Sequence, residues 1–248
     1  MSKPGAGERA DVFLVNNGFA ASRSEAQAAI RMGRVSANGR RIEKPSYLLR
    51  SGVKIEYEKP HPYVSRGGVK LAAALEKFAL SPERRICVDI GASTGGFTEV
   101  LLMGGAERVY AIDVGHGQLH GKLQRDHRVT RRDGVNGRDL NSTHVPEPPN
   151  AVVADVSFIG LKLALPPALE MAAPGAWLVA LVKPQFEVGR FAIGKGGIVR
   201  DGEAQQAALD DISKWLASIP GWTVLGTMDS PITGGEGNRE FLLAAQKA

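Results

Sequence analysis

Short apolar runs alternate with helical periodicity along most of this chain. We expect buried strands at 86–90, 109–113, 151–159 and 177–182, a short strand near 129, and two closing strands at 223–228 and 241–245. Helical patterns follow the first of these strands and fill residues 203–219. Such alternation predicts an open α/β sheet, whose ligands bind at the carboxyl ends of its strands.

The turn after the first strand, Val88–Thr98, is the most distinctive stretch. A strand, a glycine-rich turn and a helix N-terminus let backbone amides face a ligand, and Asp89 would point into the same crevice. Gly91, Ser93 and Gly95 also match the G-x-S-x-G nucleophile elbow of the α/β-hydrolases. An ordinary tight turn needs glycines too, so the spacing alone does not choose between these three interpretations.

Charged residues follow other predicted strands. Asp113 ends the second strand, where an acid commonly accepts hydrogen bonds from the ribose of an adenosine ligand. Asp155 and Lys183 follow two later apolar runs, and an unpaired buried ammonium would be costly, so we expect both at the ligand crevice. The segment 131–136 would bring polar groups near the nucleobase. Lys70 lies beside the apolar stripe of a helix, where a lone lysine is usually solvated.

The first sixty residues predict a separate small unit. Helical spacing from Ala10 ends at Asn17-Gly18, Ser22 and Glu25 form a capping-box pattern, and Asn38-Gly39 suits the type I′ turn of a hairpin. Grouped arginines on this unit would cover a phosphate backbone, although a solvated surface has the same composition. They are Arg23, Arg31, Arg34, Arg40 and Arg41.

Composition narrows the class of protein. The 248 residues are 43% hydrophobic and 23% charged, which is typical of a globular protein, and the net charge of +5 favours a polyanionic partner. Cys87 is the only cysteine, which excludes an intrachain disulfide. The first residues lack the apolar stretch of a signal peptide, and charges and prolines interrupt the most apolar segment, 161–182. We therefore expect a cytoplasmic protein that neither spans nor binds a membrane.

The positions of the histidines argue against a hydrolase. A hydrolase of this fold places its histidine after the nucleophile and the acid in the chain, but none of the five histidines follows Asp155. The elbow match is then accidental. Together with Asp113, the glycine-rich turn points instead to a site for an adenosine-containing ligand.

Two resemblances extend this interpretation. The segment RADVFLVNNGFAASRSEAQAAIRMGRVSANGRRI resembles an S4 domain, a small RNA-binding module. From Arg9 to Leu243 the chain resembles the TlyA family of S4-domain ribosomal RNA 2′-O-methyltransferases, some of which carry the name hemolysin. The segments that carry this resemblance are SRGGVKL, VDIGASTGGFT, the strand of Asp113, ADVSFI, LVKPQFE and NREF.

The resemblance implies an S4 domain of α+β type at 1–60, a linker at 61–64 and a Rossmann-like methyltransferase domain at 65–248. Its mostly parallel seven-stranded sheet would have an antiparallel last strand. The implied cofactor is S-adenosylmethionine, the partner is ribosomal RNA or a ribosomal subunit, and neither a metal nor an obligate protein partner is needed. The linker reads HPYV where better-known members carry an Arg-x-Trp-Val type segment, which leaves open whether it couples cofactor and RNA binding.

The resemblance also implies the site. The family's Lys-Asp-Lys-Glu set corresponds to Lys70, Asp155, Lys183 and Glu240, with Lys183 as the base that takes the proton of a ribose 2′-hydroxyl, and cytidine as the nucleotide. We expect the cofactor to contact Ser65, Arg66, Asp89, Gly91, Ser93, Thr94, Gly95, Gly96, Phe97, Asp113 and Asp133. The alternative functions are a non-catalytic RNA-binding assembly factor and direct membrane lysis, and the absence of a long amphipathic apolar segment argues against the latter. The segment 189–202, with Arg190 and Lys195, is a candidate lid or RNA-contact loop.

Overall fold

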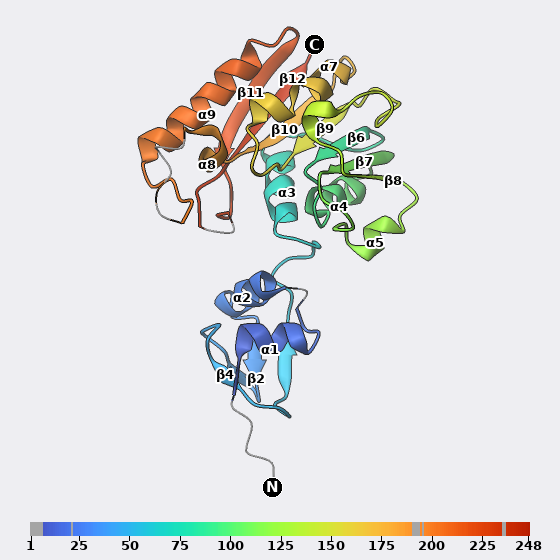
Figure 1. Ribbon diagram of the computed structural model, residues 1–248. Coiled ribbons are helices and arrows are strands. Elements are labelled where there is room, and N and C mark those ends of the chain that lie inside the picture. The colour runs from blue at the N-terminus through green and yellow to red at the C-terminus, as the bar shows by residue number, and fades with distance from the viewer. Residues whose placement is uncertain (1–6, 21, 190–193, 195, 235–236) are drawn as a thin grey trace. The chain divides into compact units, whose positions relative to one another are not determined.

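The chain forms two compact units, Met1–Pro62 and Tyr63–Ala248, each with its own hydrophobic core. Figure 1 shows the computed structural model, which describes residues 7–20, 22–189, 194, 196–234 and 237–248. Arg190 and Lys195 of the predicted lid or RNA-contact loop lie outside the described residues.

The described part of the first unit contains two short helices and five short strands. Strand β2 pairs with both β3 and β5 in an antiparallel sheet, and β1 pairs with β4. The bounds are β1 (Glu8–Arg9), α1 (Ala10–Asn16), α2 (Arg23–Arg31), β2 (Val35–Ala37), β3 (Arg40–Arg41), β4 (Leu48–Leu49) and β5 (Ile55–Tyr57).

Local signals in the sequence set these bounds. The hydroxyl of Ser22 accepts a hydrogen bond from the backbone N–H of Glu25 at 3.2 Å, so the predicted N-cap of α2 is confirmed. The Glu25 carboxylate accepts instead from the hydroxyl of Tyr57 at 2.8 Å, which ties α2 to β5. Asn38 and Gly39 have φ of 50° and 74°, as a type I′ turn requires.

The second unit is built on a seven-stranded sheet in the order β11-β12-β10-β9-β6-β7-β8. Strand β12 is antiparallel to both of its neighbours, and the pairs from β10 to β8 are parallel. The predicted mostly parallel sheet with an antiparallel last strand is therefore confirmed. The bounds are β6 (Ile86–Ile90), β7 (Arg108–Asp113), β8 (Val129–Asp133), β9 (Ala151–Ala154), β10 (Trp177–Val182), β11 (Trp222–Asp229) and β12 (Phe241–Lys247).

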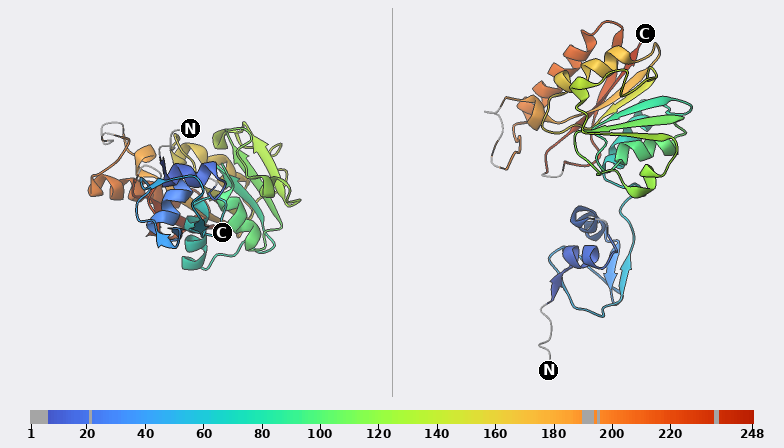
Figure 2. Two further views of the ribbon diagram at one scale, coloured as in Figure 1. Left: turned by 90° about the horizontal axis from the view of Figure 1, so that it is seen from below. Right: turned by 45° about the vertical axis from the view of Figure 1, so that its right-hand side comes forward.

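Helices cover both faces of this sheet (Figure 2). Leu71 and Leu101 pack α3 and α4 on one face, and Leu169 and Ile212 pack α7 and α9 on the other. The bounds are α3 (Gly67–Lys77), α4 (Gly96–Met103), α5 (Gly121–Gln124), η1 (Gly137–Asp139), α6 (Leu161–Ala164), α7 (Pro166–Met171), α8 (Pro184–Glu187) and α9 (Gly202–Ala217).

The apolar run at 151–159 is a strand only as far as Ala154, so the strand is shorter than predicted. The backbone N–H of Asp155 still donates to the carbonyl of Ile90 at 2.9 Å, and Phe158 then adopts a φ of 66°. Because a positive φ is incompatible with a strand, the chain cannot continue as one through Phe158. The end of β9, between β6 and β10, brings Asp155 to the carboxyl edge beside the ends of both strands.

Candidate active site

The glycine-rich turn between β6 and α4 is shaped by close contacts. Gly91 and Gly95 have φ of 82° and 97°, a region that glycine enters without strain. A Cβ atom on Gly91 would lie 2.5 Å from the carbonyl oxygen of Asp155, and one on Gly96 would overlap the hydroxyl of Ser65. The turn therefore needs glycine to pack against the segments that begin α3 and follow β9.

A polar cavity of about 260 Å³ lies against this turn. Its walls come from the start of α3, from the glycine-rich turn, and from the ends of β9 and β10. The lining residues are Ser65, Arg66, Gly67, Lys70, Gly91, Ala92, Ser93, Thr94, Gly96, Phe97, Asp155, Ser157 and Lys183.

A larger cavity of about 460 Å³ adjoins the polar one, and Gly91, Ser93, Asp155 and Ser157 line both. Its walls are mainly apolar, with three polar side chains at its edge and an exposed aromatic side chain at its mouth. These features come from Ile90, Ile112, Val135, Val156, Asp113, Gln118, Asn136 and Phe158.

The four residues of the predicted Lys-Asp-Lys-Glu set form two ion pairs. The amine of Lys70 donates to Glu240 Oε2 at 2.5 Å, across 170 residues of sequence. The amine of Lys183 lies 2.7 Å from Asp155 Oδ1 and donates to the hydroxyl of Ser157 at 2.9 Å. Both lysines are buried, with 7% and 8% of their surface exposed. Burial without such partners would be costly, so each carboxylate offsets one desolvated ammonium.

Asp113 connects β7 to the glycine-rich turn. Its carboxylate accepts from the backbone N–H of Ser93 and from that of Gly115, both at 2.7 Å. Gln118, which was missed in the sequence, accepts from the hydroxyl of Ser93 at 3.1 Å and lines the larger cavity. The feature of the sequence that could have identified Gln118 is its position just after Gly115 and Gly117, which allow the chain to turn back toward the end of β7.

Asp89 lies beneath the turn and lines neither cavity. It is fully buried and accepts from the hydroxyl of Thr98 at 2.6 Å. Burial raises the pKa of Asp89 to about 7, and the negative charges of Asp155 and Asp113 add to the rise. Alternation along β6 turns residue 89 toward the face that α4 covers, which is why it does not share the crevice with the strand ends.

Asp133 lies outside the two cavities as well. Its carboxylate accepts from the backbone N–H of Gly117 at 2.8 Å and lies 3.4 Å from the Nε of Arg131. It lines a separate hollow of about 10 Å³ beside Asp113. The polar side chain that reaches the larger cavity from this segment is that of Asn136.

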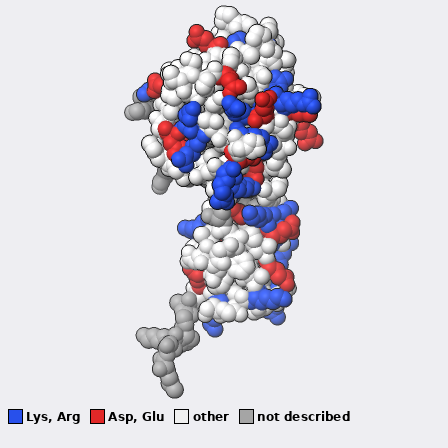
Figure 3. Space-filling view, turned by 90° about the vertical axis from the view of Figure 1, so that its right-hand side faces the viewer, with Lys and Arg blue, Asp and Glu red and all other residues white. Residues whose placement is uncertain are grey.

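The predicted arginines belong to different parts of the first unit. Arg23 and Arg31 lie on α2, and Arg40 and Arg41 form the exposed strand β3. Arg34 donates to the carbonyl of Lys59 at 2.5 Å and pairs with Glu58 at 3.1 Å. Figure 3 shows basic side chains interspersed with acidic ones on its visible face, so charge there is distributed in small groups.

The residues that the structure describes contain neither a metal-binding cluster nor a membrane-spanning helix. No group of three or more His, Cys, Asp or Glu side chains there would hold a metal ion. No helix in that part of the chain has the length and apolar character to cross a membrane.

Comparison with known proteins gives the same division of the chain. The family model for FtsJ-like methyltransferases matches residues 63–247, and the model for the S4 domain matches residues 8–55. "Putative rRNA methyltransferase YqxC" of Bacillus subtilis is 43% identical, over 95% of this chain and 84% of its own length. "16S/23S rRNA (cytidine-2'-O)-methyltransferase TlyA" of Mycobacterium tuberculosis is 40% identical, over 95% of this chain and 88% of its own length. The solved structure of "Putative hemolysin from Streptococcus thermophilus" is 42% identical with a TM-score of 0.77, covering 98% of this chain and 89% of its own.

The fold and the matched models define an FtsJ-like methyltransferase domain preceded by an S4 domain. Full-length similarity to relatives at about 40% identity narrows this class further. The chain belongs to the TlyA family.

Proposed function

We propose that this protein transfers the methyl group of S-adenosylmethionine to the 2′-hydroxyl of a cytidine in ribosomal RNA. The observation that carries the proposal is the meeting of Lys70, Asp155 and Lys183 at one polar cavity beside the glycine-rich turn. The name of the Mycobacterium tuberculosis relative supports the choice of substrate and reaction.

The two adjoining cavities suit the two ends of the cofactor. The apolar walls of the larger cavity fit an adenine ring, and Asp113 at its edge suits ribose hydroxyls. The polar cavity, with the hydroxyls of Ser65 and Thr94, suits the amino-acid end. The bound cofactor supplies an electrophilic methyl group on a positively charged sulfur. The carboxylate of Asp155, which lines both cavities, complements that positive charge.

Lys183 acts as the base in this proposal. A ribose hydroxyl is a poor nucleophile, so it must be oriented toward the methyl group and lose its proton as the new O–C bond forms. Lys183 first releases its own proton to water, and its Nζ then takes the proton of the hydroxyl while Asp155 and Ser157 hold that atom in place. Lys70, which Glu240 keeps in position, places a second amine at the same cavity.

Phe158 is the residue we propose to hold the acceptor nucleotide. Its side chain is 92% exposed at the mouth of the larger cavity, and its ring centroid lies 5.3 Å from that of Phe186. Proteins that recognise unpaired nucleotides commonly stack the base on an aromatic ring. A pair of rings near Lys183, of which that of Phe158 is exposed, would let the nucleotide enter while its ribose reaches the amine.

The first unit is the part of the chain that we propose binds RNA. Residues 1–62 contain eleven Lys and Arg and six Asp and Glu, an excess of five that equals the net charge of the whole chain. Residues 1–60 would form the RNA-binding domain and residues 61–64 the linker. An unbalanced positive charge on this unit favours contact with phosphates.

The test is methyl transfer from tritiated S-adenosylmethionine to ribosomal subunits isolated from cells that lack this protein. We expect label in ribosomal RNA and a 2′-O-methyl cytidine at the labelled position. An assembly factor without catalysis would bind the subunits and transfer no label, and that outcome would overturn the proposal. Using large and small subunits separately identifies the substrate.

A further inference from the structure

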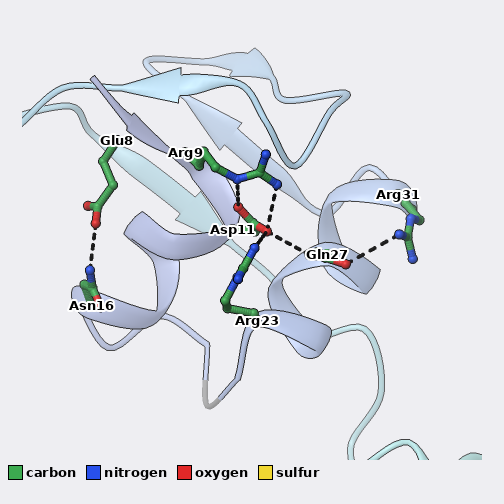
Figure 4. Close-up of polar contacts among 7 residues, drawn as sticks. All are labelled: Glu8, Arg9, Asp11, Asn16, Arg23, Gln27 and Arg31. Atoms are coloured by element: carbon green, nitrogen blue, oxygen red, sulfur yellow. Dashed lines mark hydrogen bonds and ion pairs between the residues drawn. The ribbon is translucent and has the colours of Figure 1, made fainter. Parts of the chain in front are cut away.

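A fully buried carboxylate in the first unit is contacted by two arginine side chains. Asp11, in the first turn of α1, accepts from the Nε and Nη2 of Arg9 at 3.0 and 3.1 Å. It also accepts from Arg23 at 2.9 Å and from the amide of Gln27 at 2.8 Å. Figure 4 shows these three side chains converging on Asp11, that of Arg9 from β1 and those of Arg23 and Gln27 from α2.

The contacts continue from Asp11 to a third arginine. Arg31 donates to the side-chain oxygen of Gln27 at 3.5 Å, so one series of contacts joins Arg9, Asp11, Gln27 and Arg31 (Figure 4). Arg9 was missed in the sequence because it lies fourteen residues before Arg23, the first of the predicted arginine group, and outside any helix.

The arginines remain available to another acceptor. The side chains of Arg9 and Arg23 are 47% and 58% exposed, although Asp11 is completely covered. A guanidinium has five N–H donors, and Asp11 takes two from Arg9 and one from Arg23. Holding a long side chain in one rotamer removes entropy that would otherwise be lost when it binds.

The state of Asp11 agrees with this arrangement. Burial alone would raise the pKa of its carboxyl, but hydrogen bonds from Arg9, Gln27 and Arg23 hold that pKa well below its usual value. Asp11 is therefore ionised at any pH near neutrality.

We propose that Asp11 is a positioning residue for RNA binding: with Gln27 it holds Arg9, Arg23 and Arg31 in a preset arrangement that contacts phosphates of the RNA backbone. The inference rests on the proposed function, which makes RNA the partner of this unit. Asp11 then has two opposing effects on phosphate binding. Its negative charge lowers the net positive charge of the unit, and its hydrogen bonds orient the arginines so that they bind phosphate better.

The substitution Asp11→Asn in the full-length chain tests the role. It keeps the shape of the side chain and removes its charge, and binding is measured by fluorescence anisotropy with a labelled 30-nucleotide RNA hairpin across a salt series. We expect binding about tenfold weaker at 0.1 M salt and a salt dependence shallower by about one phosphate contact. If Asp11 merely competed with phosphate, the variant would bind more tightly with a steeper salt dependence, and that result would overturn the proposal.

Glu43→Gln is the matched control, because it removes one negative charge from an exposed position of the same unit. We expect it to bind the hairpin as tightly as the unaltered protein or slightly more tightly. Arg9→Gln adds a second measurement: it should weaken binding in the unaltered protein and have little further effect beside Asp11→Asn. Equal effects in both backgrounds would show that Asp11 does not act through Arg9.

Thermal unfolding of each variant shows whether the first unit still folds. If Asp11→Asn unfolds the first unit, the variant Gln27→Met is tested in its place. It removes the contacts of Gln27 with Asp11 and Arg31, and position 27 is a partly exposed position of α2. Unchanged hairpin binding by a folded Gln27→Met would overturn the proposal. A protein that binds the hairpin in this manner but never methylates RNA would overturn the proposed function and leave the role of Asp11 standing.

Discussion

The amine of Lys183 lies 2.7 Å from Oδ1 of Asp155, and the two residues directly follow the neighbouring parallel strands β10 and β9. Parallel pairing brings both strand ends to one edge of the sheet, so this contact follows from strand order. Lys70 and Glu240 complete the polar group from α3 and from the residue before β12. The cavity thereby contains two lysines whose charges are each offset by one carboxylate.

Replacing Lys183 with alanine should remove the base without emptying the cofactor site. We expect methyl transfer to fall about 10²- to 10⁴-fold, the usual contribution of a general base, while cofactor binding changes little. Transfer of tritiated methyl groups and cofactor titration by calorimetry measure the two effects. Lys214→Ala, at an exposed position of α9, is the control and should retain full activity. Full activity of Lys183→Ala would exclude this residue as the base.

Gly96→Ala should block the cofactor site by steric overlap. Its new Cβ would overlap the hydroxyl of Ser65 and lie 2.9 Å from the backbone nitrogen of Gly68, so the start of α3 must move. We expect cofactor affinity to fall by about tenfold or more, since a shift of this size costs 1–3 kcal/mol in a packed region. Gly202→Ala, which has open space around its Cβ, should bind the cofactor normally. Equal affinities in the two variants would contradict the packing argument.

Two substitutions of Phe158 should differ in stability and be alike in their loss of activity. Its φ of 66° is strained for any residue with a Cβ, so Phe158→Gly should be about 1 kcal/mol more stable than Phe158→Ala in urea unfolding. Both variants should lose methyl transfer to RNA, because each removes the ring that we propose holds the acceptor nucleotide. Normal transfer by Phe158→Ala would remove this role.

Asp89 should make stability depend on pH. Its pKa of about 7 exceeds the 3.8 of a free aspartate, so the folded protein keeps a proton that the unfolded chain releases between pH 4 and 7. The free energy of unfolding therefore falls as pH rises through this range. The difference between a pKa of 3.8 and one of about 7 corresponds to a fall of up to about 4 kcal/mol. Asp89→Asn should remove this fall.

Urea unfolding at pH 5 and pH 8 measures the effect of Asp89, with the exposed Asp210→Asn as control. We expect the free energy of unfolding to drop between these pH values in the unaltered protein and the control, and to stay nearly level in Asp89→Asn. The same drop in all three proteins would show that another group is responsible.

Local sequence patterns determined most of the secondary structure. The strands at Ile86–Ile90 and Trp177–Val182 were predicted within one residue, because a strand buried on both faces is mostly apolar along its length. The cap at Ser22 and the turn at Asn38-Gly39 were predicted because each depends on residues a few positions apart. Burial, capping and turn chemistry are short-range effects that a single segment expresses by itself.

The tertiary structure decided which charged residues meet. Lys70 and Glu240 are 170 residues apart, and no property of either segment predicts their contact; only resemblance to a family suggested both. Asp89 was expected in the crevice and lies beneath it. Arg9 lies with Arg23 because both contact the buried carboxylate of Asp11, where α1 packs against α2. These contacts depend on strand order and helix packing, which are set by the whole chain burying its apolar surface at once.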